Sequence, residues 1–190
     1  MNIQASFVRS AASADDLPTD TLATVALVGR SNVGKSSLIN ALVRRTIART
    51  SAAPGKTRLA NVYRVQRGSA QALYLVDLPG YGFARGKAGE FESIAADAVA
   101  RADAALLLVD ARHPGLEKDR DAWRWLTETT RHRAIVATKI DKLSRAERLR
   151  ARRGLEAVFD HPVAVVSADT GEGLDELWKL IDRLANNRNR

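Results

Sequence analysis

Two glycines, a lysine and a serine are spaced as in a loop that binds phosphate groups. The run consists of Gly29, Arg30, Ser31, Asn32, Val33, Gly34, Lys35 and Ser36. Gly29 and Gly34 can adopt backbone angles closed to other residues, so successive amide N–H groups can turn inward around an anion. Lys35 would then reach the β- and γ-phosphates of a nucleotide, and Ser36 would offer its hydroxyl to Mg²⁺. An ordinary strand-to-helix turn is the alternative, and the apolar stretches on both sides of the run disfavour it.

A second set of candidate residues follows the apolar run at 72–76 and consists of Asp77, Leu78, Pro79 and Gly80. Asp77 would lie at the carboxyl edge of a sheet, where ligands of doubly wound folds bind and where a carboxylate can support Mg²⁺ through a water molecule. Gly80 has no Cβ, so its N–H could approach a γ-phosphate. An aspartate that ends a strand is commonly a turn residue, so the metal role depends on the phosphate loop.

A third set follows the apolar run at 134–137 and consists of Thr138, Lys139, Ile140 and Asp141. The carboxylate of Asp141 could accept hydrogen bonds from N1–H and N2–H₂ of guanine, whereas adenine has no N2 amine and would leave it unpaired. Lys139 could lay its methylene stem along the base. After the run at 163–166, Ser167 and Ala168 could supply a backbone N–H to guanine O6. A serine-capped loop is the alternative there, and the guanine interpretation depends on Asp141.

The segment between the first helix-like stretch and the run at 60–65 contains Pro54, Gly55, Lys56, Thr57 and Arg58. A hydroxyl here could complete the Mg²⁺ shell, and an N–H could sense the γ-phosphate. Composition alone leaves Thr46, Thr50 and Ser51 as rival hydroxyls. If a mobile loop supplies a Mg²⁺ ligand, the loop would be ordered when the γ-phosphate is present and released when it is absent, so the conformation of the protein would depend on the bound nucleotide.

The composition indicates one soluble domain with a basic surface. The chain has 190 residues, of which 45% are hydrophobic, and its net charge is +8. The absence of cysteine excludes disulfides and thiolate metal sites, and no apolar run approaches the roughly 18 residues that a membrane span needs. We therefore expect a cytoplasmic protein without a membrane span. The positive charge favours polyanionic partners such as RNA, and aromatic content of only 5% predicts contacts to backbone phosphates rather than to bases.

Arginine is concentrated in two places. One cluster consists of Arg145, Arg148, Arg150, Arg152 and Arg153, and the other of Arg44, Arg45 and Arg49. A solvated helix face is the usual explanation of such runs, and RNA contact is the hypothesis that the net charge adds.

Apolar and amphipathic stretches alternate along the chain and predict an α/β fold with helices on both faces of a mainly parallel sheet. Six strands are expected, at 25–28, 60–65, 72–76, 104–109, 134–137 and 163–166. Five helices are expected, at 35–44, 90–101, 117–130, 144–159 and 173–184. The short polar stretch at 66–71 predicts an antiparallel hairpin at the sheet edge. We expect a flexible leader over 1–22 that could add one short strand, a single domain over 23–185 and a basic tail over 186–190.

Taken together, these motifs resemble the ordered motifs of translation-factor-class GTPases, and the DLPGYG and PGKTR variants closely resemble the EngB family. The resemblance covers about residues 5–185 and implies a single P-loop GTPase domain. It assigns the first switch to Gly55, Lys56, Thr57, Arg58 and Leu59, with Thr57 as a Mg²⁺ ligand beside Ser36 and Asp77. It assigns the last base-contacting motif to Val166, Ser167 and Ala168. Catalysis would depend on Lys35, Thr57 and Gly80, with GTP or GDP as the ligand.

The family resemblance implies a role in assembly of the large ribosomal subunit and in normal cell division and septation in bacteria. Most GTPases have asparagine where Thr138 stands, but threonine is usual in EngB-like sequences. Ile140 and Ala168 replace the common alanine and serine at positions where little depends on the side chain. Tyr81 stands where Ras-like enzymes place the glutamine that orients water, so we expect slow intrinsic hydrolysis. Asn32 resembles the asparagine of K⁺-activated GTPases, and a loop-stabilising role is its alternative.

The sequence therefore predicts a monomeric, Mg²⁺-dependent GTP-binding switch that associates with the precursor of the large ribosomal subunit and its rRNA. Two other functions remain open. A P-loop kinase for a small molecule is opposed by the TKID motif at 138–141 and by the absence of an arginine-rich lid after the fourth predicted strand. A non-hydrolysing RNA-binding assembly module would use the nucleotide only as a structural ligand.

Overall fold

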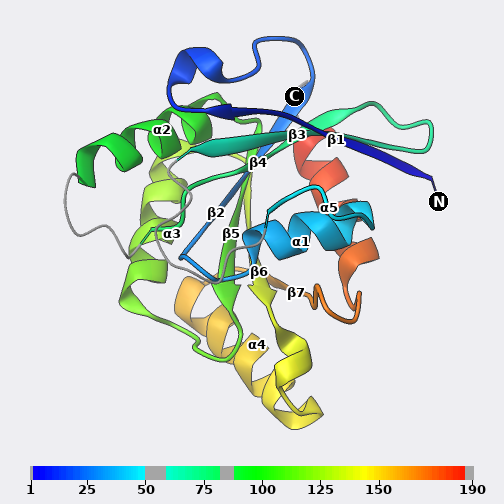
Figure 1. The fold of residues 1–190 in the computed structure, drawn as a ribbon. Helices are drawn as coiled ribbons and strands as arrows, with labels where there is room; N and C mark the ends of the chain where they lie inside the picture. The colour runs from blue at the N-terminus through cyan, green and yellow to red at the C-terminus, as the bar shows by residue number, and fades with distance from the viewer. Residues whose placement is uncertain (1, 50–58, 82–87, 187–190) are drawn as a thin grey trace.

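A central β-sheet with helices on both faces makes up the protein (Figure 1). The computed structural model describes residues 2–49, 59–81 and 88–186. Within these ranges the sheet has seven strands in the order β1-β3-β4-β2-β5-β6-β7. The strands are β1 (Ile3–Ala11), β2 (Ala23–Gly29), β3 (Ala60–Arg67), β4 (Leu73–Asp77), β5 (Ala104–Asp110), β6 (Arg133–Thr138) and β7 (Val163–Val165). Strands β4, β2, β5, β6 and β7 are mutually parallel, and β3 runs antiparallel to both of its neighbours.

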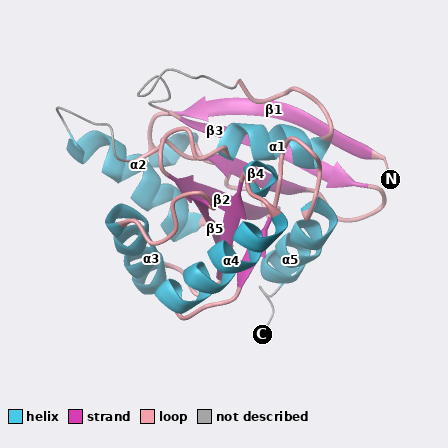
Figure 2. Ribbon diagram, turned by 90° about the horizontal axis from the view of Figure 1, so that it is seen from below, coloured by secondary structure: helices cyan, strands magenta, loops and turns pink. Residues whose placement is uncertain are grey.

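In the part of the chain that the structure describes, five α-helices cover the sheet and follow the loops that could carry the chemistry. They are α1 (Lys35–Val43), α2 (Ala88–Arg101), α3 (Glu117–Thr129), α4 (Arg145–Phe159) and α5 (Leu174–Asn186). Figure 2 shows α1 and α5 on one side of the sheet and α2 and α3 on the other. None of the helices in the described ranges combines the length and apolar character that a bilayer crossing requires.

Two buried clusters form the core, one on each face of the sheet. Consecutive residues of β5 alternate between them, because side chains of a strand point to opposite faces. Leu106 and Leu108 pack with α1 and α5, whereas Leu107 and Val109 pack with α2, α3 and α4. All seven residues of β5 are buried, as expected for a strand covered by helices on both faces.

The predicted helices and the six predicted strands agree with the structure to within two residues at each end. The helices and strands start and stop where local signals are strong. At the start of α4, for example, Ser144 accepts a hydrogen bond from the Glu147 N–H, and the Glu147 side chain accepts one from the Ser144 N–H.

Within the leader expected over 1–22, residues 3–11 form β1, a nine-residue strand antiparallel to β3 and longer than the short strand considered there. The sheet therefore has seven strands rather than six, β1 rather than β3 is at the edge, and β3 is interior. Apolar periodicity could not reveal β1, because most of its side chains are exposed, including Phe7 and Val8. The strand is held in the sheet by its hydrogen-bonded ladder with β3 and by the edge-to-face contact of Phe7 with Tyr63. Of the predicted basic tail, Asn186 ends α5 and 187–190 lie outside the described residues.

Candidate nucleotide-binding site

The candidate residues gather at the carboxyl edge of the parallel strands. Gly29 ends β2, Asp77 ends β4, Asp110 ends β5 and Thr138 ends β6. Because these strands are adjacent and parallel, the loops that follow them emerge at one edge of the sheet. The fold thus brings together three motifs that are far apart in the sequence.

The two glycines of the phosphate loop are required for different reasons, and only Gly34 has the left-handed backbone expected of both. Gly34 has φ +107° at the start of α1, in the left-handed region that favours glycine. A Cβ on Gly29 would lie 2.8 Å from Val33 Cγ1 and 2.9 Å from the Leu108 carbonyl oxygen. The tight turn around 29–34 therefore depends on both glycines.

Lys35 lies buried at the beginning of α1. Its Nζ donates hydrogen bonds to the carbonyl oxygens of Gly29 at 3.0 Å and Arg30 at 3.3 Å. Burial lowers the pKa of Lys35, and the nearby carboxylate of Asp77 opposes this effect. The two hydrogen bonds hold the ammonium group against the backbone at the start of the loop.

Ser36 and Asp77 bring oxygen atoms together beside Lys35. Ser36 Oγ donates a 2.5 Å hydrogen bond to Asp77 Oδ2, and Asp77 is only 3% exposed. Burial raises the pKa of Asp77, while Lys35 and the Ser36 hydrogen bond act in the opposite direction. A hydroxyl and a buried carboxylate are ligands that suit Mg²⁺, so the donor chemistry fits this ion. Thr57, the third predicted ligand, lies outside the described residues together with Gly55, Lys56 and Arg58, and Leu59 is exposed.

The segment after Asp77 is fastened to the phosphate loop. Ser31 N–H donates to the Tyr81 carbonyl oxygen, and Ser31 Oγ donates to the Gly80 carbonyl oxygen, each at 3.3 Å. A Cβ on Gly80 would lie 2.6 Å from the Ser31 backbone, so the close approach requires glycine. Leu78 is buried in the core and anchors the same segment.

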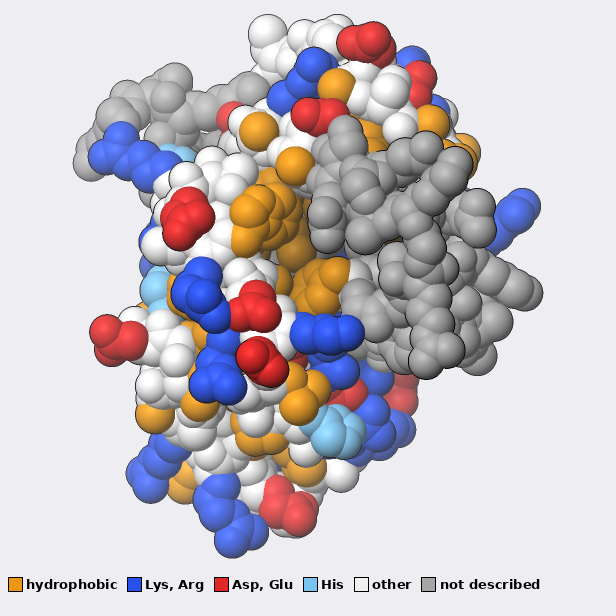
Figure 3. Space-filling model, turned by 90° about the vertical axis from the view of Figure 1, so that its left-hand side faces the viewer, with side chains coloured by type: hydrophobic (Ala, Val, Ile, Leu, Met, Phe, Trp, Pro, Cys, Tyr) orange, Lys and Arg blue, Asp and Glu red, His pale blue; other side chains and the backbone are white. Residues whose placement is uncertain are grey.

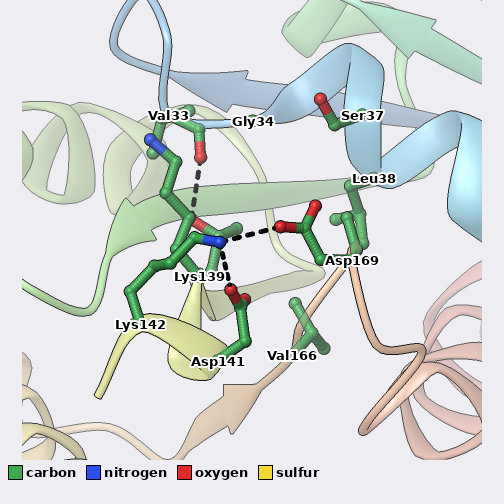
Figure 4. Close-up of a pocket in the computed structure, with 11 residues that line it drawn as sticks. Val33, Gly34, Ser37, Leu38, Lys139, Asp141, Lys142, Val166 and Asp169 are labelled. Atoms are coloured by element: carbon green, nitrogen blue, oxygen red, sulfur yellow. Dashed lines mark hydrogen bonds and ion pairs between the residues drawn. The ribbon is translucent and has the colours of Figure 1, made fainter.

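A pocket of about 150 Å³ lies between the phosphate loop and the loops after β6 and β7 (Figure 4). It is lined by Val33, Gly34, Ser37, Leu38, Thr138, Lys139, Asp141, Lys142, Val166, Ala168 and Asp169. Apolar side chains from α1 and the β7 loop face the polar residues of the β6 loop. An aromatic ring with a polar edge matches this division of the lining.

Asp141 is held in the pocket by two neighbours. Ser167 Oγ donates to Asp141 Oδ1 at 2.7 Å, and Lys142 Nζ lies 2.9 Å from Oδ2 and 3.0 Å from Asp169 Oδ2 (Figure 4). These hydrogen bonds, that of Lys142 first and that of Ser167 next, lower the pKa of Asp141. The carboxylate is therefore charged at neutral pH and fixed in orientation.

Thr138 and Lys139 connect this pocket to the phosphate loop. The hydroxyl of Thr138, which is buried, lies 2.8 Å from the Val33 carbonyl oxygen and 3.1 Å from that of Val109. Lys139 Nζ donates to the Asn32 carbonyl oxygen at 2.6 Å, and its stem lines the pocket. Threonine at 138 thus makes a side-chain hydrogen bond to the phosphate loop.

The remaining members of the base-contacting motifs lie in the core or line the pocket. Ile140 is 2% exposed and packs in the core, and Val166 is 1% exposed. The Ser167 N–H donates to the Glu172 carbonyl oxygen at 3.0 Å, so this N–H is engaged within its own loop. Ala168, which lines the pocket, is then the better placed of the two predicted backbone donors.

Sequence reasoning missed two buried acids at the site. Asp110 Oδ2 lies 3.1 Å from Lys139 Nζ, and Arg112 bonds both Asp110 oxygens. Burial raises the pKa of Asp110, but the hydrogen bonds from Arg112 and Lys139 outweigh it and hold that pKa well below its usual range. Asp110 ends its strand as Asp77 does, a signal that could have found it. Asp119 is on α3 and contacts Arg30 and Tyr81.

Comparison with known proteins agrees with this geometry. Residues 24–139 match the family model described as "50S ribosome-binding GTPase". The "Probable GTP-binding protein EngB" of Chlorobaculum parvum is 44% identical over 96% of this chain and 98% of its own length. The chain belongs to the EngB family. Its relative in Heliobacterium modesticaldum, also named a probable GTP-binding protein EngB, is 41% identical over 94% of this chain and 91% of its own. As a member of this family, the chain is a GTP-binding protein of the GTPase class.

Solved structures show the same fold. A probable EngB structure is 24% identical, with a TM-score of 0.65, and covers 87% of this chain and all of its own length. An Era structure with MgGDPNP and a fragment of 16S ribosomal RNA is 27% identical, with a TM-score of 0.76, over 86% of this chain. This chain spans 56% of that Era chain, so the comparison concerns the G domain and not the remainder of Era.

Proposed function

We propose that this EngB family member is a Mg²⁺-dependent switch that distinguishes guanine nucleotides and hydrolyses GTP slowly. The observation that carries the proposal is the pocket beside the phosphate loop, in which a fixed, charged Asp141 faces apolar walls. The two oxygens of Asp141 would accept from N1–H and N2–H₂ of guanine, the Ala168 N–H would donate to O6, and the Lys139 stem would cover the ring. Adenine would leave the carboxylate without these donors.

Calorimetry with GDP and ADP on the purified chain tests this specificity. We expect GDP to bind and ADP to bind at least about 100-fold more weakly, because a polar site rejects a base that cannot make its hydrogen bonds. Equal affinities would contradict guanine recognition and would favour a kinase.

We assign Mg²⁺ to Ser36, Asp77 and Thr57. The contact of Ser36 Oγ with a buried carboxylate supports the first two residues, and the family motif supports Thr57. Bound Mg²⁺ would neutralise charge on the β- and γ-phosphate oxygens. Lys35 would orient and neutralise the same phosphates, and the Gly80 N–H would approach the γ-phosphate. Titration of GDP binding with and without EDTA tests the metal requirement.

Slow hydrolysis is expected because Tyr81 offers no group to orient water. Its hydroxyl donates a 2.9 Å hydrogen bond to Asp119 of α3, so this donor is already used within the protein. Phosphate release at multiple turnover, alone and with ribosomal particles, tests the rate and would remove the non-hydrolysing alternative. Comparison of the rates in KCl and NaCl tests K⁺ activation through Asn32, and equal rates would dismiss it.

We further propose that the partner is the precursor of the large ribosomal subunit, that contact is through rRNA phosphates, and that the protein acts as a monomer in the cytoplasm. Arg145, Arg150 and Arg153 are exposed on α4, and Lys and Arg side chains occur among acidic and apolar ones over the lower part of the face in Figure 3. Arg44, Arg45 and Arg49 are also exposed and form a second candidate contact.

Co-sedimentation with ribosomal subunits tests the partner. We expect binding to the large-subunit precursor with a non-hydrolysable GTP analogue and less with GDP. Equal sedimentation in both states would contradict a switch. The role in cell division and septation would follow from defective ribosome assembly, and depletion of the protein tests it.

A further inference from the structure

Asp119 is a buried carboxylate to which two loops of the site are bonded. It lies in the first turn of α3, its residue surface is 0% exposed, and its Oδ1 receives both Tyr81 OH at 2.9 Å and Arg30 Nε at 3.1 Å. Its Oδ2 has no hydrogen-bond partner among the described residues. One oxygen atom thus joins three elements that are distant in the sequence.

The two partners of Asp119 have defined places in the proposed switch. Arg30 follows β2 in the phosphate loop, and Tyr81 is the residue directly after Gly80. Their backbones form an isolated parallel bridge, which the Ser31 N–H extends by donating to the Tyr81 carbonyl oxygen. The side-chain bonds to Asp119 therefore act on a segment that the backbone already holds against the phosphate loop.

The energetics argue against a purely structural role. Burying a carboxylate is costly, and a carboxylate with one oxygen unpartnered recovers only part of that cost. An apolar side chain would pack at this position of α3 with less penalty. An apolar side chain cannot accept hydrogen bonds from a phenol and a guanidinium. Asp119 accepts both at one oxygen atom and so fixes the positions of Tyr81 and Arg30 relative to each other.

We propose that Asp119 is a positioning residue that sets where Gly80 and Tyr81 lie relative to the phosphate loop. It thereby couples the nucleotide's phosphate chain to α3. The inference rests on the proposed function, in which the Gly80 N–H approaches a γ-phosphate. Any movement of Gly80 toward or away from that phosphate must displace Tyr81, because the two residues are adjacent. Displacement of Tyr81 would then either break its hydrogen bond to Asp119 or move α3. The free energy of this contact therefore contributes to the preference between GDP and GTP.

The test compares affinities for GDP and for the analogue GMPPNP in wild type, Tyr81→Phe, Asp119→Ala and the double variant. Tyr81→Phe removes only the hydroxyl and keeps the ring, so it stays informative if Asp119→Ala unfolds. The matched control is Asp121→Ala, at an exposed acid on the same helix that pairs with Arg124. We expect both single variants to change the ratio of the two affinities at least about fivefold in the same direction, with no further change in the double variant. The control should keep the wild-type ratio.

A second readout is amide hydrogen exchange of α3. In wild type, exchange over Glu117–Thr129 should differ between the GDP and GMPPNP complexes, and Tyr81→Phe should abolish the difference. A variant that weakens both nucleotides equally, or α3 exchange that is the same in both wild-type complexes, would overturn the inference. Failure of wild type to bind guanine nucleotides would instead overturn the proposed function, so the two failures are distinguishable.

Discussion

Single carboxylates carry the proposed selectivity of this site, and Asp141 is the clearest case. Its two oxygens are aligned by Ser167 and Lys142. In Asp141→Asn, one of the two guanine hydrogen bonds would face an amide N–H and be lost. Because each bond to a charged group contributes about 1.5–3 kcal/mol, we expect GDP affinity to fall about 10- to 150-fold. Xanthosine diphosphate, which has a carbonyl in place of the N2 amine, should bind this variant better than GDP does. Calorimetry with both nucleotides measures this reversal, and Asp121→Asn, at an exposed acid of α3 that does not line the pocket, is the control.

A second prediction at the scale of residues concerns how Asp110 affects the free energy of unfolding at acid pH. Because its pKa is lowered in the folded state by Arg112 and Lys139, its stabilising contribution is present above the unfolded pKa, near 3.9, and is lost as pH falls through the lower folded value. In Asp110→Asn, the decrease in the free energy of unfolding between pH 7 and pH 3 should therefore be smaller than in wild type. Urea titrations at several pH values measure it. An unchanged pH dependence would contradict the assignment.

At the scale of elements, replacing two glycines by alanine should change the stability of the protein in opposite directions. One glycine lies within a helix and the other directly precedes one. Gly154 lies within α4, and a Cβ there would meet nothing within 4 Å. Gly173 precedes α5 with φ +78°, and its Cβ would lie 2.1 Å from the Val165 carbonyl oxygen. We expect Gly154→Ala to stabilise the protein by about 0.5–1 kcal/mol, and Gly173→Ala to destabilise it by more than about 2 kcal/mol. Chemical denaturation distinguishes them, and similar effects at both positions would contradict the argument.

At the scale of the whole molecule, the net charge of +8 should appear in the salt dependence of partner binding. Each arginine that contacts a phosphate releases about one counterion on binding. Replacing Arg145, Arg150 and Arg153 by Gln should lower the slope of log affinity against log salt by about two to three. A variant with Gln at Arg9, Arg64 and Arg124, which are also exposed, loses the same charge elsewhere. Equal slopes in the two variants would assign binding to net charge rather than to α4.

Most of the fold was predictable because its signals are local. The apolar run of β5 and the amphipathic pattern of α3 reflect burial against helices and sheet, which the sequence records residue by residue. Strand β1 has no such pattern of apolar residues, because its position depends on backbone hydrogen bonds to β3 and not on buried side chains. An edge strand of this kind forms only because the neighbouring strand offers backbone groups to pair with.

By itself, the sequence determined the order of the helices and of the six strands after β1, the phosphate loop and the identity of the loops that meet at the sheet edge. These features depend on neighbours within a few residues, such as the glycines at 29 and 34. Only the tertiary structure decided which side chains meet across those loops. Asp119 lies 38 residues from Tyr81 and 89 from Arg30, yet it binds both, and in the sequence it is simply an acid in the first turn of a helix. Contacts of this range arise from the packing of α3 against the sheet, which no local pattern specifies.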